Sequence, residues 1–146
     1  MFILNCKGRL LVAETPLVMG ILNITPDSFY AGSRVEISNI LRRAEKMLAE
    51  GADMLDIGAQ STRPGSELLN ADEELVRLDG VIAAILREFP RTIISIDTFY
   101  SQVAKECVLA GATIVNDISG GGMDSEMITT VGQLGVPYIC MHMRGT

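Results

Sequence analysis

The chain has 146 residues, of which 48% are hydrophobic and 21% are charged. This is enough apolar material for one ordinary domain with a core, and it excludes a disordered chain. The 18 acidic and 12 basic side chains give a net charge of −6 without a basic run, so nucleic acid is not an expected partner.

The N-terminal residues 1–20 contain only short apolar pieces, which Lys7, Arg9 and Glu14 interrupt. They lack both the continuous apolar core of a secretory signal and the length of a membrane span. We therefore expect a cytoplasmic protein that has no membrane partner.

Short apolar runs alternate with amphipathic stretches, after two N-terminal segments, FILN and RLLVA, that have the pattern of a small hairpin. Nearly continuous apolar character is typical of strands in a parallel sheet that is covered on both faces. On this basis we expect buried strands at residues 17–23, 54–58, 92–97, 113–118 and 138–142.

The stretches between these strands have helical periodicity. Asn70 fits the N-cap of the second helix, with Glu73 in its first turn as the partner of a capping box. Gly51, Gly111 and Gly135 each follow a helical stretch, where glycine can adopt the left-handed backbone that ends a helix. We expect helices with apolar stripes over residues 37–48, 75–89, 103–110 and 127–134.

Strands joined by helical crossovers, without a two-residue hairpin among them, imply a parallel sheet, which fits either a doubly wound sheet or a (β/α)8 barrel. Polar residues near the C-terminal strand ends favour the barrel, because a barrel draws its active site from several strands at that face. The alternative for any one of them is a turn or helix cap, the commoner role of a single Asp or Asn. These polar residues are Asn23, Asp56, Asp97, Asn116, Asp117 and His142.

Asp97 is the most informative of these residues because it closes an apolar strand, IISID. A carboxylate in that position costs free energy unless backbone groups or a ligand with N–H donors pair with it. Asn116, one strand further along, offers both a donor and an acceptor. Together, the two side chains suit a flat heterocycle that carries N–H groups.

The loop after the strand at residues 54–58 reads GAQSTRPGS and holds Thr62 and Arg63 ahead of Pro64 and Gly65. The planar guanidinium of arginine donates two parallel hydrogen bonds, which suits phosphate. The alternative is an arginine that is simply exposed in a turn.

The segments GILNITPDSF, STRPGS, SIDT, VNDISGG and MHM occur in this order, and as a set they resemble the dihydropteroate synthase family. The resemblance implies a (β/α)8 TIM-barrel fold. Residues 1–146 would form the N-terminal portion of a single pterin-binding domain, an incomplete barrel of about five parallel strands with an N-terminal hairpin. It also implies condensation of 6-hydroxymethyl-7,8-dihydropterin pyrophosphate with p-aminobenzoate, which gives 7,8-dihydropteroate and pyrophosphate in folate biosynthesis.

The resemblance also implies how the pterin is bound. Asp97 and Asn116 would hold the heterocycle deep in the barrel. The apolar residues packed near its ring would be Ile21, Ile118 and Met141.

The implied pyrophosphate and p-aminobenzoate sites involve other residues. Asn23 would lie beside the pyrophosphate and a magnesium ion, the one expected cofactor. Thr62 and Arg63 belong to a loop that would close over p-aminobenzoate. The expected catalytic residues are therefore Asp97, Arg63 and Asn23, which stabilise charge as pyrophosphate leaves.

The chain departs from the family pattern in its loops. Ala31 stands where the family usually has an acid, and Gln60 replaces the acid that more often precedes Ser-Thr-Arg. Family residues from the later strands, which bind the pterin and the anion, have no counterpart here, so we expect the isolated chain to be inactive. We also expect a homodimer, and the family implies sensitivity to sulfonamides.

Two other hypotheses stay open. A related methyltransferase barrel, which uses methyltetrahydrofolate and a corrinoid partner, shares Asp and Asn at strand ends. Its methyl donor has no pyrophosphate, so the Thr-Arg pair argues against it. In the other hypothesis, the chain is a non-catalytic half-barrel assembly module, because open sheet edges and an unclosed apolar interior drive association.

Overall fold

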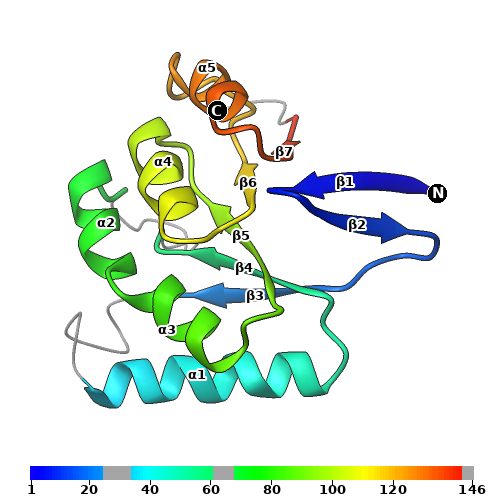
Figure 1. Cartoon of the computed structure of the whole chain (residues 1–146). Coiled ribbons are helices and arrows are strands. Elements are labelled where there is room, and N and C mark those ends of the chain that lie inside the picture. The colour runs from blue at the N-terminus through cyan, green and yellow to red at the C-terminus, as the bar shows by residue number, and fades with distance from the viewer. Residues whose placement is uncertain (25–33, 61–67, 143–146) are drawn as a thin grey trace.

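The computed structural model describes residues 1–24, 34–60 and 68–142 of the chain (Figure 1). The predicted N-terminal hairpin is confirmed and consists of antiparallel strands β1 (Phe2–Cys6) and β2 (Arg9–Ala13). The predicted strands that follow are also confirmed, and together they form one parallel sheet of five strands. They are β3 (Met19–Asn23), β4 (Met54–Gly58), β5 (Ile93–Asp97), β6 (Ile114–Asp117) and β7 (Tyr138–Cys140).

The order of the strands in the sheet follows the chain, β3-β4-β5-β6-β7. In a doubly wound sheet the order reverses partway, so helices cover both faces. In a barrel each right-handed crossover adds the next strand on the same side, so the helices form an outer layer. The sequential order is therefore that of an incomplete (β/α) barrel.

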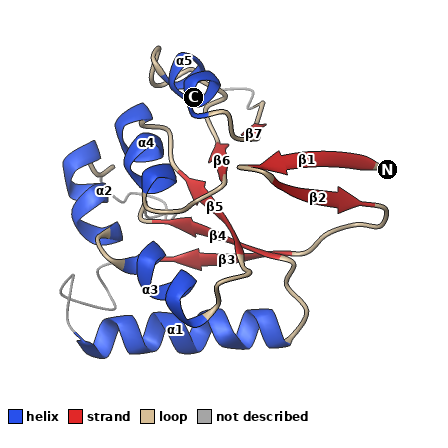
Figure 2. Cartoon of the chain, viewed as in Figure 1, coloured by secondary structure: helices blue, strands red, loops and turns tan. Residues whose placement is uncertain are grey.

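The helices form that outer layer around the curved sheet (Figure 2). In the described part of the chain, none of them has the length and apolar character that crossing a membrane requires. Their bounds are α1 (Arg34–Ala49), α2 (Ala71–Leu78), α3 (Val81–Glu88), α4 (Ser101–Leu109) and α5 (Met127–Leu134).

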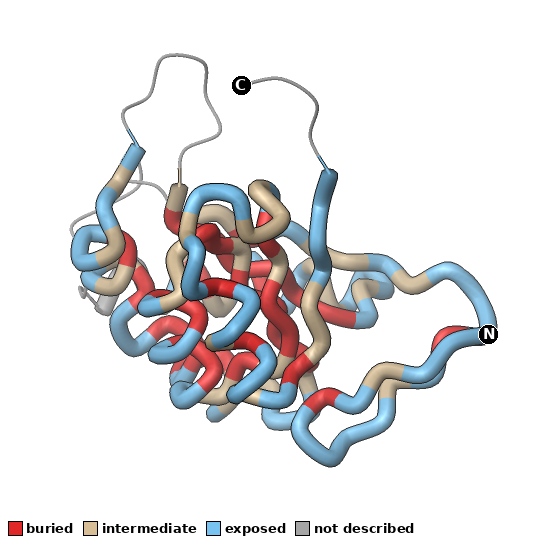
Figure 3. Tube along the Cα trace, turned by 90° about the horizontal axis from the view of Figure 1, so that it is seen from above, coloured by how far each residue is buried: buried red, intermediate tan, exposed pale blue. Residues whose placement is uncertain are grey.

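The two faces of the sheet have separate apolar cores, because alternate strand residues point to opposite sides. The side chains that pack against the helices include Leu22, Leu55, Ile57, Ile94, Ile96 and Val115. The opposite face is apolar where the strands begin, and there Met19, Met54, Ile93 and Ile114 pack against the hairpin. Figure 3 shows buried positions concentrated in the sheet and its helical layer, whereas the hairpin is mostly exposed. The hairpin thus covers the end of the sheet opposite to the C-terminal strand ends.

The prediction of one continuous helix from its cap at Asn70 to Phe89 is wrong, because α2 ends at Leu78 and α3 begins at Val81. Gly80 adopts a φ of 70°, a left-handed conformation that an α-helix cannot continue through. The apolar period nevertheless runs across the break, since Leu78 and Ile82 are both buried. Periodicity alone could not reveal the interruption.

The predicted cap of α2 is confirmed. The side chain of Asn70 accepts a hydrogen bond from the backbone N–H of Glu73 at 3.0 Å, and the Glu73 carboxylate accepts one from the backbone N–H of Asn70 at 2.9 Å. This reciprocal capping box satisfies backbone donors that have no partner inside the helix.

We expect Asn70→Ala to lower the free energy of unfolding by about 1 kcal/mol, because the replacement removes the acceptor for the Glu73 N–H. Urea denaturation followed by circular dichroism measures this loss. Asn70→Asp is the matched control because it keeps the oxygen acceptor, and its stability should stay close to that of the parent chain. Equal losses in both variants would show that the cap contributes nothing.

Candidate active site

The C-terminal strand ends bring polar side chains into one row across the sheet. The pairing register aligns Asn23 with Gly58, Gly58 with Asp97, Asp97 with Asn116, and Asn116 with Ile139. We call these aligned residues the upper row. The next row toward the hairpin contains Ile21, Asp56, Ser95 and Ile114, and we call it the middle row. Both rows lie on the face of the sheet away from the helices, which corresponds to the interior of a barrel.

Asp97 and Asn116, which the sequence predicted to converge, are direct partners in the upper row. Asn23 lies in the same row but is separated from Asp97 by strand β4. Its backbone carbonyl accepts a hydrogen bond from Arg43 of α1 at 3.2 Å. The fold therefore places all three residues at the same end of the sheet.

Gly58 makes room for the Asp97 carboxylate. A Cβ atom at Gly58 would lie 3.1 Å from Asp97 Oδ2 and 3.2 Å from Asp97 Cβ, closer than ordinary van der Waals contact. The absence of a side chain on β4 at this height therefore leaves the carboxylate free to turn over the neighbouring strand. Sequence analysis did not identify this role of Gly58.

Asp97 is the acidic member of the upper row, and its surroundings perturb its pKa strongly. Burial, followed by the nearby carboxylates of Asp56 and Asp117, raises its pKa from 3.8 to about 6. Desolvation and like charges both disfavour the ionised form. A ligand that donates N–H groups or carries positive charge would relieve this cost, so Asp97 has the properties of a binding carboxylate.

Asp56 is a site residue that sequence analysis noted in its strand but gave no role. It is 4% exposed, and its Oδ2 accepts a hydrogen bond from Asn116 Nδ2 at 2.9 Å. The signal that could have identified it is an acid in the middle of an otherwise apolar strand, MLDIG. Such a residue is costly unless it has a specific partner.

The expected apolar contacts Ile21, Ile118 and Met141 have exposed side chains. Ile21, in the middle row, is 60% exposed, and Ile118 and Met141 are each 41% exposed. Ile118 follows β6, and Met141 follows β7 with its N–H donating to the carbonyl of Asp117 at 3.2 Å. These side chains therefore provide apolar surface near the C-terminal strand ends that the described residues leave uncovered.

The buried carboxylate of Asp117 organises the chain after β6. Its Oδ1 accepts hydrogen bonds from the backbone N–H and the hydroxyl of Ser119, both at 2.7 Å. Its Oδ2 accepts from the N–H of Gly121 at 2.8 Å and from the Tyr138 hydroxyl at 2.7 Å. Asp117 thus ties the turn that carries Ile118 to strand β7.

Thr62 and Arg63 lie outside the described residues, but the positions that flank their loop are described. The Gln60 amide donates to the Leu69 carbonyl and accepts from the Leu69 N–H, both at 3.1 Å. It also donates to Glu74 Oε2 at 2.9 Å. Burial raises the pKa of Glu74, whereas the hydrogen bond from Gln60 lowers it. An acid at position 60 would place a second carboxylate beside this buried one, which gives a physical reason for Gln60.

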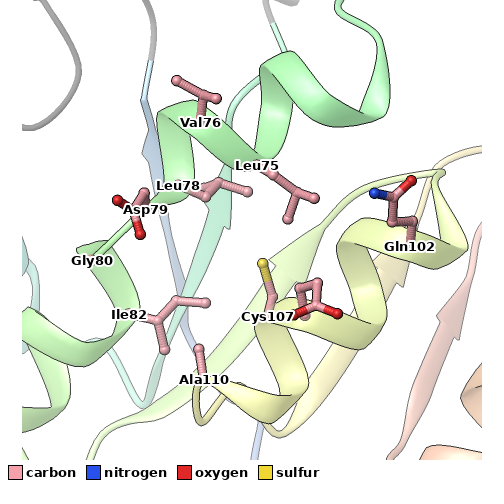
Figure 4. A pocket seen from close by; sticks show the side chains of 10 residues that line it. Leu75, Val76, Leu78, Asp79, Gly80, Ile82, Gln102, Cys107 and Ala110 are labelled. Atoms are coloured by element: carbon pink, nitrogen blue, oxygen red, sulfur yellow. The ribbon is translucent and has the colours of Figure 1, made fainter.

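A groove of about 630 Å³ lies elsewhere, between α2, α3 and α4 on the outer helical layer (Figure 4). Its lining includes Leu75, Ile82 and Cys107, with the carboxylates of Asp79 and Glu106. None of the predicted site residues lines it. The groove is therefore separate from the candidate active site at the strand ends.

The residues of the described part of the chain do not form a metal centre by themselves. Among them, no group of three or more His, Cys, Asp or Glu side chains could hold a metal ion. Asn23 offers a single amide oxygen, and His142 is exposed beyond β7. A hard cation at Asn23 would need most of its ligands from a substrate and from water.

Comparison with known proteins gives a consistent result. The family described as "Pterin binding enzyme" matches residues 19–146. The mitochondrial folate synthesis bifunctional protein of Pisum sativum is 50% identical over 142 residues, which cover 95% of this chain and 28% of that protein.

Solved structures of dihydropteroate synthase from Xanthomonas albilineans are also similar. The complex with 4-aminobenzoic acid has a TM-score of 0.86 at 38% identity, over 98% of this chain and 52% of that one. The complex with 7,8-dihydropteroate has a TM-score of 0.81 at 34% identity, over 97% and 51%. The chain thus spans about half the length of these solved relatives and less of the pea protein.

Proposed function

Because this chain belongs to the pterin binding enzyme family, we propose that it forms the pterin-binding part of a dihydropteroate synthase. The reaction would join 6-hydroxymethyl-7,8-dihydropterin pyrophosphate to p-aminobenzoate. The observation that carries the proposal is the pairing of Asp97 with Asn116 in the upper row. The solved Xanthomonas albilineans complexes support it, since they hold 4-aminobenzoic acid and 7,8-dihydropteroate.

The chemistry of the upper row fits the pterin ring. The Asp97 carboxylate accepts N–H groups of the heterocycle, and the cost of its own burial falls when it does so. Asn116 forms hydrogen bonds with an adjacent edge of the same ring. The side chains of Ile21, Ile118 and Met141 contact the flat surface of the ring. In this arrangement, Asp97 also favours positive charge that develops on the pterin as the pyrophosphate leaves.

We propose that Asn23 binds at the pyrophosphate end of the substrate. Its amide oxygen suits magnesium, which commonly keeps water and phosphate oxygens as its other ligands. When bound, the ion would neutralise charge on the departing pyrophosphate. Thr62 and Arg63 are proposed, from their motif alone, to contact this anion and p-aminobenzoate.

The open sheet limits what the chain can do alone. Strands β3 and β7 are the edges of the five-stranded sheet, and Ile21 in the interior is 60% exposed. An interior open to water weakens electrostatic stabilisation of a reacting substrate. We therefore propose that the isolated chain binds the pterin but does not turn it over.

The same open edges favour self-association, so the homodimer stays a prediction, and a non-catalytic half-barrel assembly module stays the second candidate function. The relatives reported above are named for folate synthesis and dihydropteroate synthase, which favours this function over the methyltransferase. A cytoplasmic location, magnesium dependence and sulfonamide sensitivity stay predictions.

Calorimetric titration with 6-hydroxymethyl-7,8-dihydropterin pyrophosphate, with and without magnesium, tests the proposal. We expect saturable binding that Asp97→Ala weakens by about 100-fold, because two hydrogen bonds to a charged acceptor are lost. Glu45→Ala, which removes an exposed acid of α1, is the matched control and should bind like the parent chain. Absence of binding by the folded parent chain, or equal binding by Asp97→Ala, would reject the pterin site.

A further inference from the structure

A partly buried hydrogen bond links the middle and upper rows. Asn116 Nδ2 on β6 donates to Asp56 Oδ2 on β4 at 2.9 Å, although the two residues are 60 positions apart in the chain. Strand β5 lies between β4 and β6 in the sheet (Figure 1). The hydrogen bond therefore spans β5 on the face of the sheet that corresponds to the barrel interior. Asp56 is 4% exposed, which makes water a poor competitor for this bond.

This bond determines which way the Asn116 amide is turned. An ionised carboxylate only accepts hydrogen bonds, whereas the two ends of an amide differ, one being a donor and the other an acceptor. With the nitrogen directed toward Asp56, the carbonyl oxygen of Asn116 is left for other partners. The reversed amide would set its oxygen against the Asp56 carboxylate, an arrangement without a hydrogen bond.

The middle row has polar atoms that core packing does not explain. Asp56 Oδ1 and Ser95 Oγ are buried and have no hydrogen-bond partner among the described residues. These two residues are direct partners in the register between β4 and β5. Apolar side chains at both positions would avoid this desolvation cost. A carboxylate at this position is therefore better explained by its hydrogen bond with Asn116 than by stability.

We propose that Asp56 is a positioning residue, which holds the Asn116 amide with its carbonyl oxygen toward the bound heterocycle. Beside Asp97, this orientation presents adjacent hydrogen-bond acceptors and selects a ring edge that carries neighbouring N–H donors. The inference rests on the proposed pterin-binding function and deepens it, because it names a residue that determines specificity without touching the ligand.

The test replaces Asp56 by Leu, which has a similar size and no acceptor, and compares it with Asp56→Asn. The affinity for 6-hydroxymethyl-7,8-dihydropterin pyrophosphate should fall about tenfold in Asp56→Leu, the equivalent of one hydrogen bond. Stability should be equal or higher, because a buried carboxylate with an unpaired oxygen is removed. Asp56→Asn should recover part of the affinity, since its neutral carbonyl can accept the same N–H.

Nuclear magnetic resonance of the Asn116 side-chain amide provides a readout that needs no ligand. The amide proton that is donated to Asp56, assigned through its loss in Asn116→Ala, should be protected from exchange with water in the parent chain. That protection should disappear in Asp56→Leu and persist in Ser95→Ala, which removes an unpartnered hydroxyl of the same row.

The outcomes separate the two proposals. Loss of protection together with weaker binding in a folded Asp56→Leu supports the positioning role. Unchanged Asn116 signals in Asp56→Leu overturn it, as does an equal loss of affinity in Ser95→Ala. Should the parent chain bind no pterin, the proposed function fails, and the amide signals still decide whether Asp56 orients Asn116.

Discussion

Replacement of Asp97 by Asn is expected to make the protein more stable at pH 7.5 while it weakens pterin binding. Burial and the carboxylates of Asp56 and Asp117 raise the pKa of Asp97 from 3.8 to about 6 in the folded chain. The charged form that predominates at pH 7.5 is thus disfavoured by folding, and a neutral amide of the same shape removes that cost.

The direction of the pH dependence follows from the raised pKa. The protonated carboxyl contributes its full stability below pH 3.8, and this contribution is lost as the pH rises through about 6. The whole shift corresponds to about 3 kcal/mol, but the side chain is only partly buried, so we expect a gain of about 1–2 kcal/mol for Asp97→Asn at pH 7.5.

Urea denaturation at pH 7.5 and pH 4.0 measures this difference. The stability advantage of Asp97→Asn should be present at pH 7.5 and nearly absent at pH 4.0, where the parent carboxyl is itself protonated. Glu45→Gln, at an exposed position of α1, should show no such difference. A destabilised Asp97→Asn at pH 7.5 would mean that the ionised carboxylate stabilises the folded chain, which is the role of a structural residue and not of a binding residue.

Replacement of Asp117 by Ala is expected to cause the largest loss of stability, about 3–5 kcal/mol. The fully buried carboxylate accepts hydrogen bonds from Ser119, Gly121 and Tyr138 at 2.7–2.8 Å. Each bond to a charged acceptor contributes about 1.5–3 kcal/mol, and relaxation of the turn recovers part of the sum. The turn after β6 and the end of β7 should lose their order together.

Tyr138→Phe is the matched control for Asp117→Ala, because it removes one of the donors and leaves the carboxylate in place. Its loss should be about 1–2 kcal/mol. Burial and the hydrogen bond to Asp117 raise the pKa of Tyr138, so the hydroxyl stays protonated and donates throughout the neutral range. Hydrogen exchange at the β7 amides should accelerate in Asp117→Ala far more than in Tyr138→Phe. Equal effects would show that the contacts to Ser119 and Gly121 contribute little.

The stability predictions for these two acids have opposite signs, although both residues lie at C-terminal strand ends. Asp117 points away from the barrel interior and receives donors from its own loop and from β7. Asp97 lies in the upper row, beside other carboxylates that raise its pKa. The first has the environment of a structural residue and the second that of a binding residue, a distinction that strand position alone does not make.

Local patterns in the sequence were sufficient for most of the secondary structure and for the family. Apolar runs and helical stripes reflect short-range periodicity, and the Asn70 cap depends on residues only three positions apart, so each can be recognised within a short window. The convergence of Asp97 and Asn116 also followed, because parallel strands end at the same edge of a sheet. The role of Thr62 and Arg63 still rests on their motif, since both lie outside the described residues.

The sequential order of the strands confirmed the barrel, which the polar strand ends and the family resemblance had already favoured over a doubly wound sheet. Only the tertiary structure decided the features that depend on register and burial. The contact between Asp56 and Asn116, the space above Gly58 and the raised pKa of Asp97 all require strands that are remote in sequence to meet in one register. The break at Gly80 was hidden because the apolar period continued through it. Sequence periodicity indicates which face of a helix or strand is apolar. These features depend instead on which residues of other elements pack against it.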